Sequence, residues 1–90
     1  MSVHYTIRVY GKVQGVFFRA STQDKAESLG ILGWVKNEAD GSVRIEAEGP
    51  EQQMQEFIEW CKQGPNHAKV EKVDYKEDNP QGFVRFEVRH

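Results

Sequence analysis

The 90-residue sequence contains a single cysteine, Cys61, so no disulfide bond can form within the chain. A lone thiol is typical of proteins kept in a reducing compartment, and we therefore expect a cytoplasmic location. The sequence also lacks any apolar run long enough to cross a bilayer, and no basic segment followed by an apolar stretch marks a signal peptide after Met1. We accordingly expect no contact with a membrane.

Neither sign of charge dominates, because 12 Lys and Arg stand against 14 Asp and Glu, for a formal net charge of −2. General nucleic-acid binding needs an excess of basic side chains on one face, and the RNA-recognition signature of a basic residue, glycine and aromatics is missing. Glu46 and Glu48 share the polar side of one predicted strand, where they would repel phosphates. We expect no nucleic-acid partner and assign most aromatic side chains to the core.

Clusters of metal-ligating residues are missing as well. His4, His67 and His90 fall in three different predicted elements, and no Cys–His or carboxylate group has ligand spacing. We expect no metal and no other cofactor, with each histidine solvated or at an edge. Cys61 lies on an apolar helical stripe and is interpreted as core packing.

The order of periodic segments predicts one domain, residues 1–90. Alternating apolar residues indicate strands at 3–10, 31–37, 43–48, 70–75 and 84–88, with a hairpin turn at 38–41. Helical spacing indicates one helix at 20–29, capped by Ser21 or Thr22 and ended by Gly30, and another from Pro50–Glu51 to before Gly64. This βαββαβ order plus a short terminal strand favours a ferredoxin-like α+β sandwich, an antiparallel sheet with both helices on one face.

The most informative stretch is GKVQGVFFR, residues 11–19, between the first strand and the first helix. Gly11 and Gly15 can adopt positive φ, which curls the chain and turns successive N–H groups inward. These amides, the helix N-terminus and the planar fork of Arg19 together predict a phosphate site. The stretch lacks the Gly-Lys-Ser/Thr ending and the G-x-G-x-x-G spacing of nucleotide-binding loops.

GKVQGVFFR closely resembles the signature of the acylphosphatases, small enzymes that hydrolyse carboxyl phosphates, and GWVKN at 33–37 is similar to the second segment of that family. The resemblance covers nearly all 90 residues. It implies that Arg19 binds the substrate phosphate, that Asn37 holds the attacking water, and that Thr22 has some role in steadying the loop. The amides that it implies for the phosphate cradle are those of Gln14, Gly15, Val16, Phe17 and Phe18.

Plainer interpretations exist for these residues. Arg19 could be a surface arginine paired with an acid, Asn37 a turn residue at a strand end, and Gln14, like Lys12, a solvent-facing or loop-bracing side chain. The implied chemistry is nevertheless sensible. A carboxylate is a good leaving group, so a held phosphoryl group and an aligned water suffice, and a carboxamide can accept from water while it donates to phosphate.

We therefore expect a monomeric, metal-independent acylphosphatase that acts on a small acyl phosphate, with inorganic phosphate as product and inhibitor. The alternative is a non-catalytic anion- or metabolite-binding module on the same fold. Phe17 stands where animal relatives frequently have cysteine, and the chain ends in Arg89-His90 where they often have arginine and tyrosine. Whether the terminal carboxylate contacts Arg19 stays open.

Overall fold

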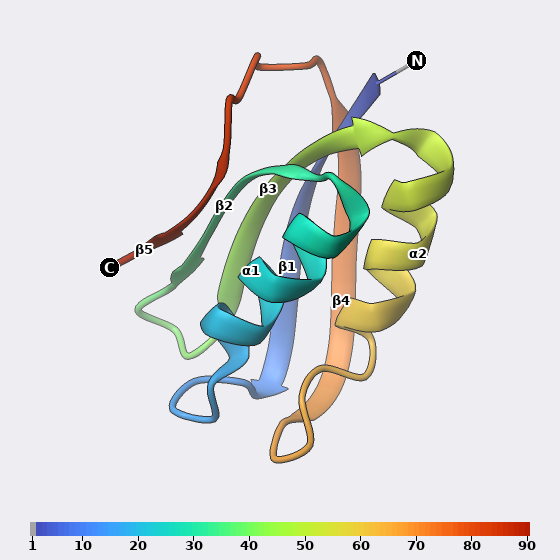
Figure 1. Ribbon diagram of the computed structural model, residues 1–90. Helices are drawn as coiled ribbons and strands as arrows, with labels where there is room; N and C mark the ends of the chain where they lie inside the picture. Colours follow the sequence, from blue (N-terminus) through green and yellow to red (C-terminus); the bar gives the residue numbers. More distant parts are fainter. Residues whose placement is uncertain (1) are drawn as a thin grey trace.

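A five-stranded sheet with two helices on one face forms the fold, as Figure 1 shows. The computed structural model describes residues 2–90. The elements follow in the order β1 (Ser2–Lys12), α1 (Phe18–Leu29), β2 (Leu32–Asn37), β3 (Val43–Pro50), α2 (Glu51–Cys61), β4 (Lys69–Asp78) and β5 (Phe86–Arg89).

The strands are arranged as β4-β1-β3-β2-β5. β1 pairs antiparallel with β3 and β4, and β2 pairs antiparallel with β3, which confirms the predicted ferredoxin-like class. β5 adds a parallel pairing with β2, from Gly33 opposite Phe86 to Lys36 opposite Arg89, so the complete sheet is mixed. β4 and β2 run in opposite directions. The chain reverses its direction after β4 and crosses to the far edge of the sheet, so β5 runs in the same direction as β2 and pairs with it in parallel.

The core lies between the sheet and the two helices. Alternate strand residues such as Ile7, Ile45 and Val35 are fully buried there, as their period of two predicts. The apolar stripe predicted on α2 is buried along its whole length, from Met54 to Cys61. Burial raises the pKa of the Cys61 thiol, so this side chain packs as an uncharged group.

α1 begins earlier than the sequence predicts. Its first residue is Phe18, and Phe17 before it has φ 62° and ψ 24° and provides no side-chain cap. Ser21 and Thr22, predicted as caps, therefore lie inside the helix, where Thr22 Oγ1 donates a 2.7 Å hydrogen bond to the Phe18 carbonyl. The glycine loop leads directly into the first turn, so backbone conformation sets the helix start. Gly30 ends the helix with φ 70°, as predicted.

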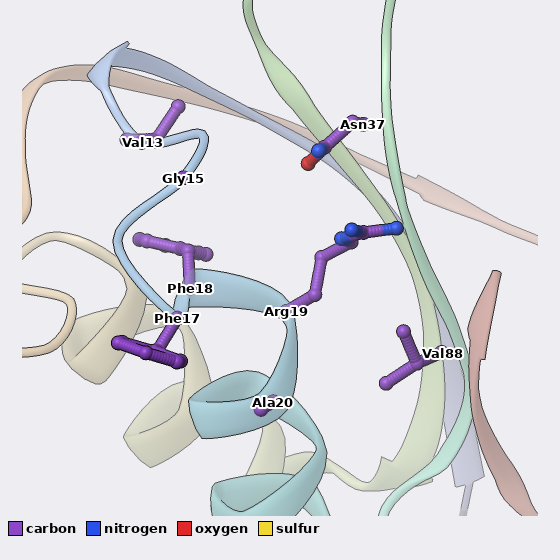
Figure 2. Close-up of a pocket in the computed structure, with 8 residues that line it drawn as sticks. All are labelled: Val13, Gly15, Phe17, Phe18, Arg19, Ala20, Asn37 and Val88. Carbon is purple, nitrogen blue, oxygen red and sulfur yellow. The ribbon is translucent and has the colours of Figure 1, made fainter. Parts of the chain in front are cut away.

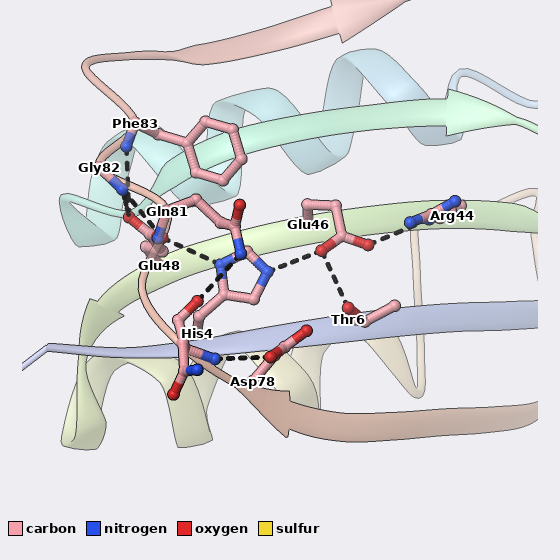
Figure 3. A network of polar contacts seen from close by, with 10 residues as sticks. His4, Thr6, Arg44, Glu46, Glu48, Asp78, Gln81, Gly82 and Phe83 are labelled. Atoms are coloured by element: carbon pink, nitrogen blue, oxygen red, sulfur yellow. Dashed lines mark hydrogen bonds and ion pairs between the residues drawn. The ribbon is translucent and has the colours of Figure 1, made fainter.

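Residues 79–85 connect β4 at one edge of the sheet to β5 at the other (Figure 1). The Glu48 carboxylate holds this crossover by accepting hydrogen bonds from the backbone N–H groups of Gln81, Gly82 and Phe83 (Figure 3). Burial raises the pKa of Glu48, but these hydrogen bonds and one from His4 outweigh it, so the net pKa lies below the ordinary value. Val84, predicted to start the last strand, is instead an exposed residue of the crossover.

His4 is the centre of the network under this crossover. It is fully buried, which overturns the prediction of a solvated or edge histidine. Its Nε2 lies 2.6 Å from Glu46 and its Nδ1 lies 3.0 Å from Glu48, while the Phe83 ring stacks on it at 5.8 Å (Figure 3). The Glu46 and Glu48 carboxylates therefore belong to a structural network. The crossover covers this polar face of the sheet, which was expected from the sequence to be open.

Candidate functional site

A pocket of about 300 Å³ lies where the loop before α1 meets the ends of β2 and β5 (Figure 2). It is lined by Val13, Gly15, Phe17, Phe18, Arg19, Ala20, Asn37 and Val88. Asn37 and Val88 lie on the helix side of the sheet, because they share the face of buried Val35 and Phe86. The fold thus brings Arg19 and Asn37, which are far apart in the sequence, to one cavity.

The loop has the backbone conformation of an anion-binding nest. Gly15 has φ 74° and Phe17 has φ 62°, and Val16 between them has no positive φ. Such alternation turns successive N–H groups to one side of the chain. Within residues 2–90, no protein acceptor takes a hydrogen bond from the N–H groups of residues 14–18. These amides are therefore free to bind an anion.

Gly11 forms a bulge near the end of β1, just before the loop begins. The β1–β4 register shifts between Tyr10 and Gly11, where Gly11 has φ 124°. A Cβ at this position would lie 2.2 Å from the Lys69 carbonyl oxygen, so only glycine fits. After this bulge, Gly11 and Lys12 still pair with Val70 and Lys69, and the chain then leaves the sheet for the loop.

Gln14 braces the loop against the β2–β3 hairpin. Its Nε2 donates hydrogen bonds of 2.8 and 2.9 Å to the carbonyl oxygens of Glu38 and Ser42. In the same turn, Asp40 Oδ1 accepts from the backbone and hydroxyl of Ser42, which lowers the pKa of Asp40. Because Asn37 directly precedes this turn, Gln14 fixes the loop relative to Asn37, as the loop-bracing interpretation predicts.

Arg19 extends from the first turn of α1 towards β5. Its Nη1 donates a 2.9 Å hydrogen bond to the Arg89 carbonyl and lies 3.1 Å from Nδ1 of His90. Within residues 2–90, no carboxylate, the C-terminal one included, lies within 4.0 Å of an Arg19 nitrogen. A carbonyl and an imidazole thus orient the guanidinium, and its positive charge has no acidic partner in the described chain.

Asn37 is the last residue of β2 and pairs with Val43 across the hairpin. Figure 2 shows its side chain directed into the space between the loop and Arg19. Its Oδ1 is buried and accepts no hydrogen bond from the described residues. A buried acceptor without a donor costs free energy, so this oxygen is well placed to accept from a water molecule.

The structure places most of the predicted site residues together. Gly15, Phe17, Phe18, Arg19 and Asn37 line the pocket, whereas the Gln14 side chain braces the hairpin and the Val16 side chain is buried. Val88 was not predicted from the sequence, and the end of the chain contacts Arg19 through the Arg89 carbonyl and the His90 ring, whereas the possibility left open above was the terminal carboxylate. No local pattern places β5 beside β2, so the sequence could not show that Val88 lies at the site.

Two further properties bear on the site. Within residues 2–90, no group of three or more His, Cys, Asp or Glu side chains is arranged to hold a metal ion. Across the same described range, neither helix reaches the length and apolar character that a membrane crossing requires.

Comparison with known proteins places the chain among one family. The family model described as Acylphosphatase matches residues 5–88. An acylphosphatase from Rubrobacter xylanophilus is 50% identical over 86 residues, which are 92% of this chain and 78% of the relative. One from Acaryochloris marina is 51% identical over 89% of this chain and 86% of its own length. The crystal structure of acylphosphatase from Bacillus subtilis superposes with a TM-score of 0.95 at 42% identity, over 98% of this chain and 99% of that one.

Proposed function

The chain belongs to the acylphosphatase family and is therefore a hydrolase of acyl phosphates, and we propose that its reaction takes place in the pocket between the loop, Arg19 and Asn37. One observation carries this proposal. A guanidinium without an acidic partner and a carboxamide oxygen without a donor, both within the described residues, line the same cavity. The first suits a phosphoryl group and the second suits a water molecule.

We propose that the N–H groups of residues 14–18 and the guanidinium of Arg19 bind the three terminal oxygens of the phosphoryl group. The nest conformation at Gly15 and Phe17 and the N-terminus of α1 support this role for the amides. These donors would be placed before the reaction, so they stabilise the charge that develops as the acyl oxygen departs.

Asn37 would align the nucleophile. Its Oδ1 accepts a hydrogen bond from the water, and its amide N–H donates one to a phosphoryl oxygen, which places the water oxygen in line with the bond that breaks. The water oxygen bonds to phosphorus, the bond from phosphorus to the acyl oxygen breaks, and the electron pair leaves with the carboxylate. A phosphoryl oxygen takes the water's proton. The step needs neither a protein base nor a metal, because a carboxylate is a good leaving group.

We further propose that the enzyme is one domain and works as a monomer in the cytoplasm. A single copy of the chain supplies Arg19, Asn37 and the loop that the proposed reaction uses. The single cysteine is buried and forms no disulfide bond within the chain, which is typical of proteins in a reducing compartment. Inorganic phosphate would occupy the same donors as the substrate and would inhibit competitively.

Release of phosphate from benzoyl phosphate tests the proposed function. We expect turnover at the same rate with and without excess EDTA, and competitive inhibition by inorganic phosphate. A protein that binds phosphate but releases none from benzoyl phosphate would be a non-catalytic module. Loss of activity with EDTA, restored by a divalent cation, would contradict the metal-free mechanism.

A further inference from the structure

Phe17 exposes an aromatic ring next to the proposed phosphate site. Its side chain is 80% exposed, whereas its neighbour Phe18 is 2% exposed and belongs to the core. Exposed phenyl rings forgo the burial that favours phenylalanine in folded proteins. Phe17 therefore contributes little to the core, and its presence needs another explanation.

The backbone does not explain the residue either. Phe17 is the only residue other than glycine with a positive φ in the described chain, at 62°. Left-handed conformation is uncommon for bulky residues and is better tolerated by glycine or asparagine. A phenylalanine here is unfavourable for the backbone and is not used by the core, so contact with a ligand is the role that is left for its ring.

The position of the Phe17 ring indicates which part of a ligand it would contact. Phe17 lines the pocket together with Ala20, which lies in the first turn of α1, and Val88, which lies on β5, and both add apolar surface. Figure 2 shows the Phe17 ring directed away from the Arg19 guanidinium. A phosphoryl group held by the loop amides and Arg19 must point its acyl group out of the cradle. The acyl group then reaches the rim, where these apolar side chains lie.

We propose that the Phe17 ring binds the acyl group and makes the enzyme favour acyl phosphates with aromatic or bulky apolar acyl groups over small ones such as acetyl phosphate. This inference rests on the proposed function, since it assumes that the phosphoryl group occupies the cradle. Contact between an apolar acyl group and the ring removes both from water, which stabilises the bound substrate.

The test compares benzoyl phosphate with acetyl phosphate in each variant, as the ratio of their kcat/KM values. The ratio cancels any effect on the cradle that both substrates share. Phe17→Asn removes the ring and suits the positive φ, whereas Phe17→Leu keeps an apolar side chain. Val84→Asn is the matched control, because Val84 is also 80% exposed but lies on the crossover outside the pocket.

We expect the ratio to fall about 3- to 10-fold in Phe17→Asn, the range of one aromatic contact. The loss should arise mainly from a higher KM for benzoyl phosphate, since the contact binds ground state and transition state alike. Phe17→Leu should retain most of the preference, and Val84→Asn all of it. An unchanged ratio in Phe17→Asn, or an equal fall in Val84→Asn, would overturn the inference. If the parent enzyme hydrolysed neither substrate, the proposed function itself would fail.

Discussion

Replacing Arg19 with alanine is expected to lower kcat/KM for benzoyl phosphate by about 10²–10³-fold, the scale of deleting a preorganised donor that stabilises developing charge. Arg19 has no acidic partner in the described chain, so its charge is available to the phosphoryl oxygens. Steady-state kinetics of phosphate release measure the change. Arg19→Lys should recover only part of the loss, because an ammonium keeps the charge but not the planar fork.

The fold should survive this substitution. Arg19 donates to the Arg89 carbonyl, and the loss of one such hydrogen bond costs about 1 kcal/mol of unfolding free energy. Arg85→Ala is the matched control, since Arg85 is exposed on the crossover and makes no ion pair in the described chain. Parent-like turnover in Arg19→Ala, or an equal loss in Arg85→Ala, would contradict the role of Arg19.

Replacing Asn37 with alanine is expected to lower kcat by about 10²-fold, again the scale of one preorganised polar group. The inhibition constant of inorganic phosphate should change much less, because the amides and Arg19 still hold the anion. This split distinguishes a residue that places water from one that binds phosphate. It is measured by kcat with benzoyl phosphate and by competitive inhibition with phosphate, in the same buffer.

Asn66→Ala provides the control for this variant, because Asn66 is an exposed asparagine in the turn after α2. Asn37→Asp gives a second comparison. A carboxylate still accepts a hydrogen bond from water, but it donates none to the phosphoryl group and repels it. We therefore expect Asn37→Asp to weaken phosphate binding as well as kcat. If Asn37→Ala raised the phosphate inhibition constant as much as Arg19→Ala, the assignment of water to Asn37 would be wrong.

Features that depend on local sequence were predictable. Alternating apolar residues predicted β1 and β3, and the stripe from Met54 to Cys61 predicted α2, because each pattern records which side of an element is buried. The spacing of Gly11 and Gly15 predicted a curled loop, and both have positive φ. The candidate site followed because the loop and Asn37 lie in two short motifs.

Features that depend on distant neighbours were not predictable. His4 alternates with apolar residues like any outward-facing strand residue, and its burial depends on residues 79–85 crossing above it. α1 starts at Phe18 because of the conformation of the loop backbone, and no capping side chain in the sequence marks this position. Likewise, Arg19 contacts the Arg89 carbonyl only because the crossover places β5 beside β2 at the edge of the sheet. Such contacts join segments that share no local pattern.

Hydrolysis in this pocket requires that the loop amides and Arg19 bind the same anion. A phosphate titration followed by 15N NMR tests it most directly, through the backbone amides of residues 14–18 and the Nε–H of Arg19. We expect all of these signals to shift along one saturable curve with one Kd, and we expect the amide signals of Arg19→Ala to shift only at much higher phosphate concentrations. Unmoved loop amides, or a different Kd for Arg19, would contradict it.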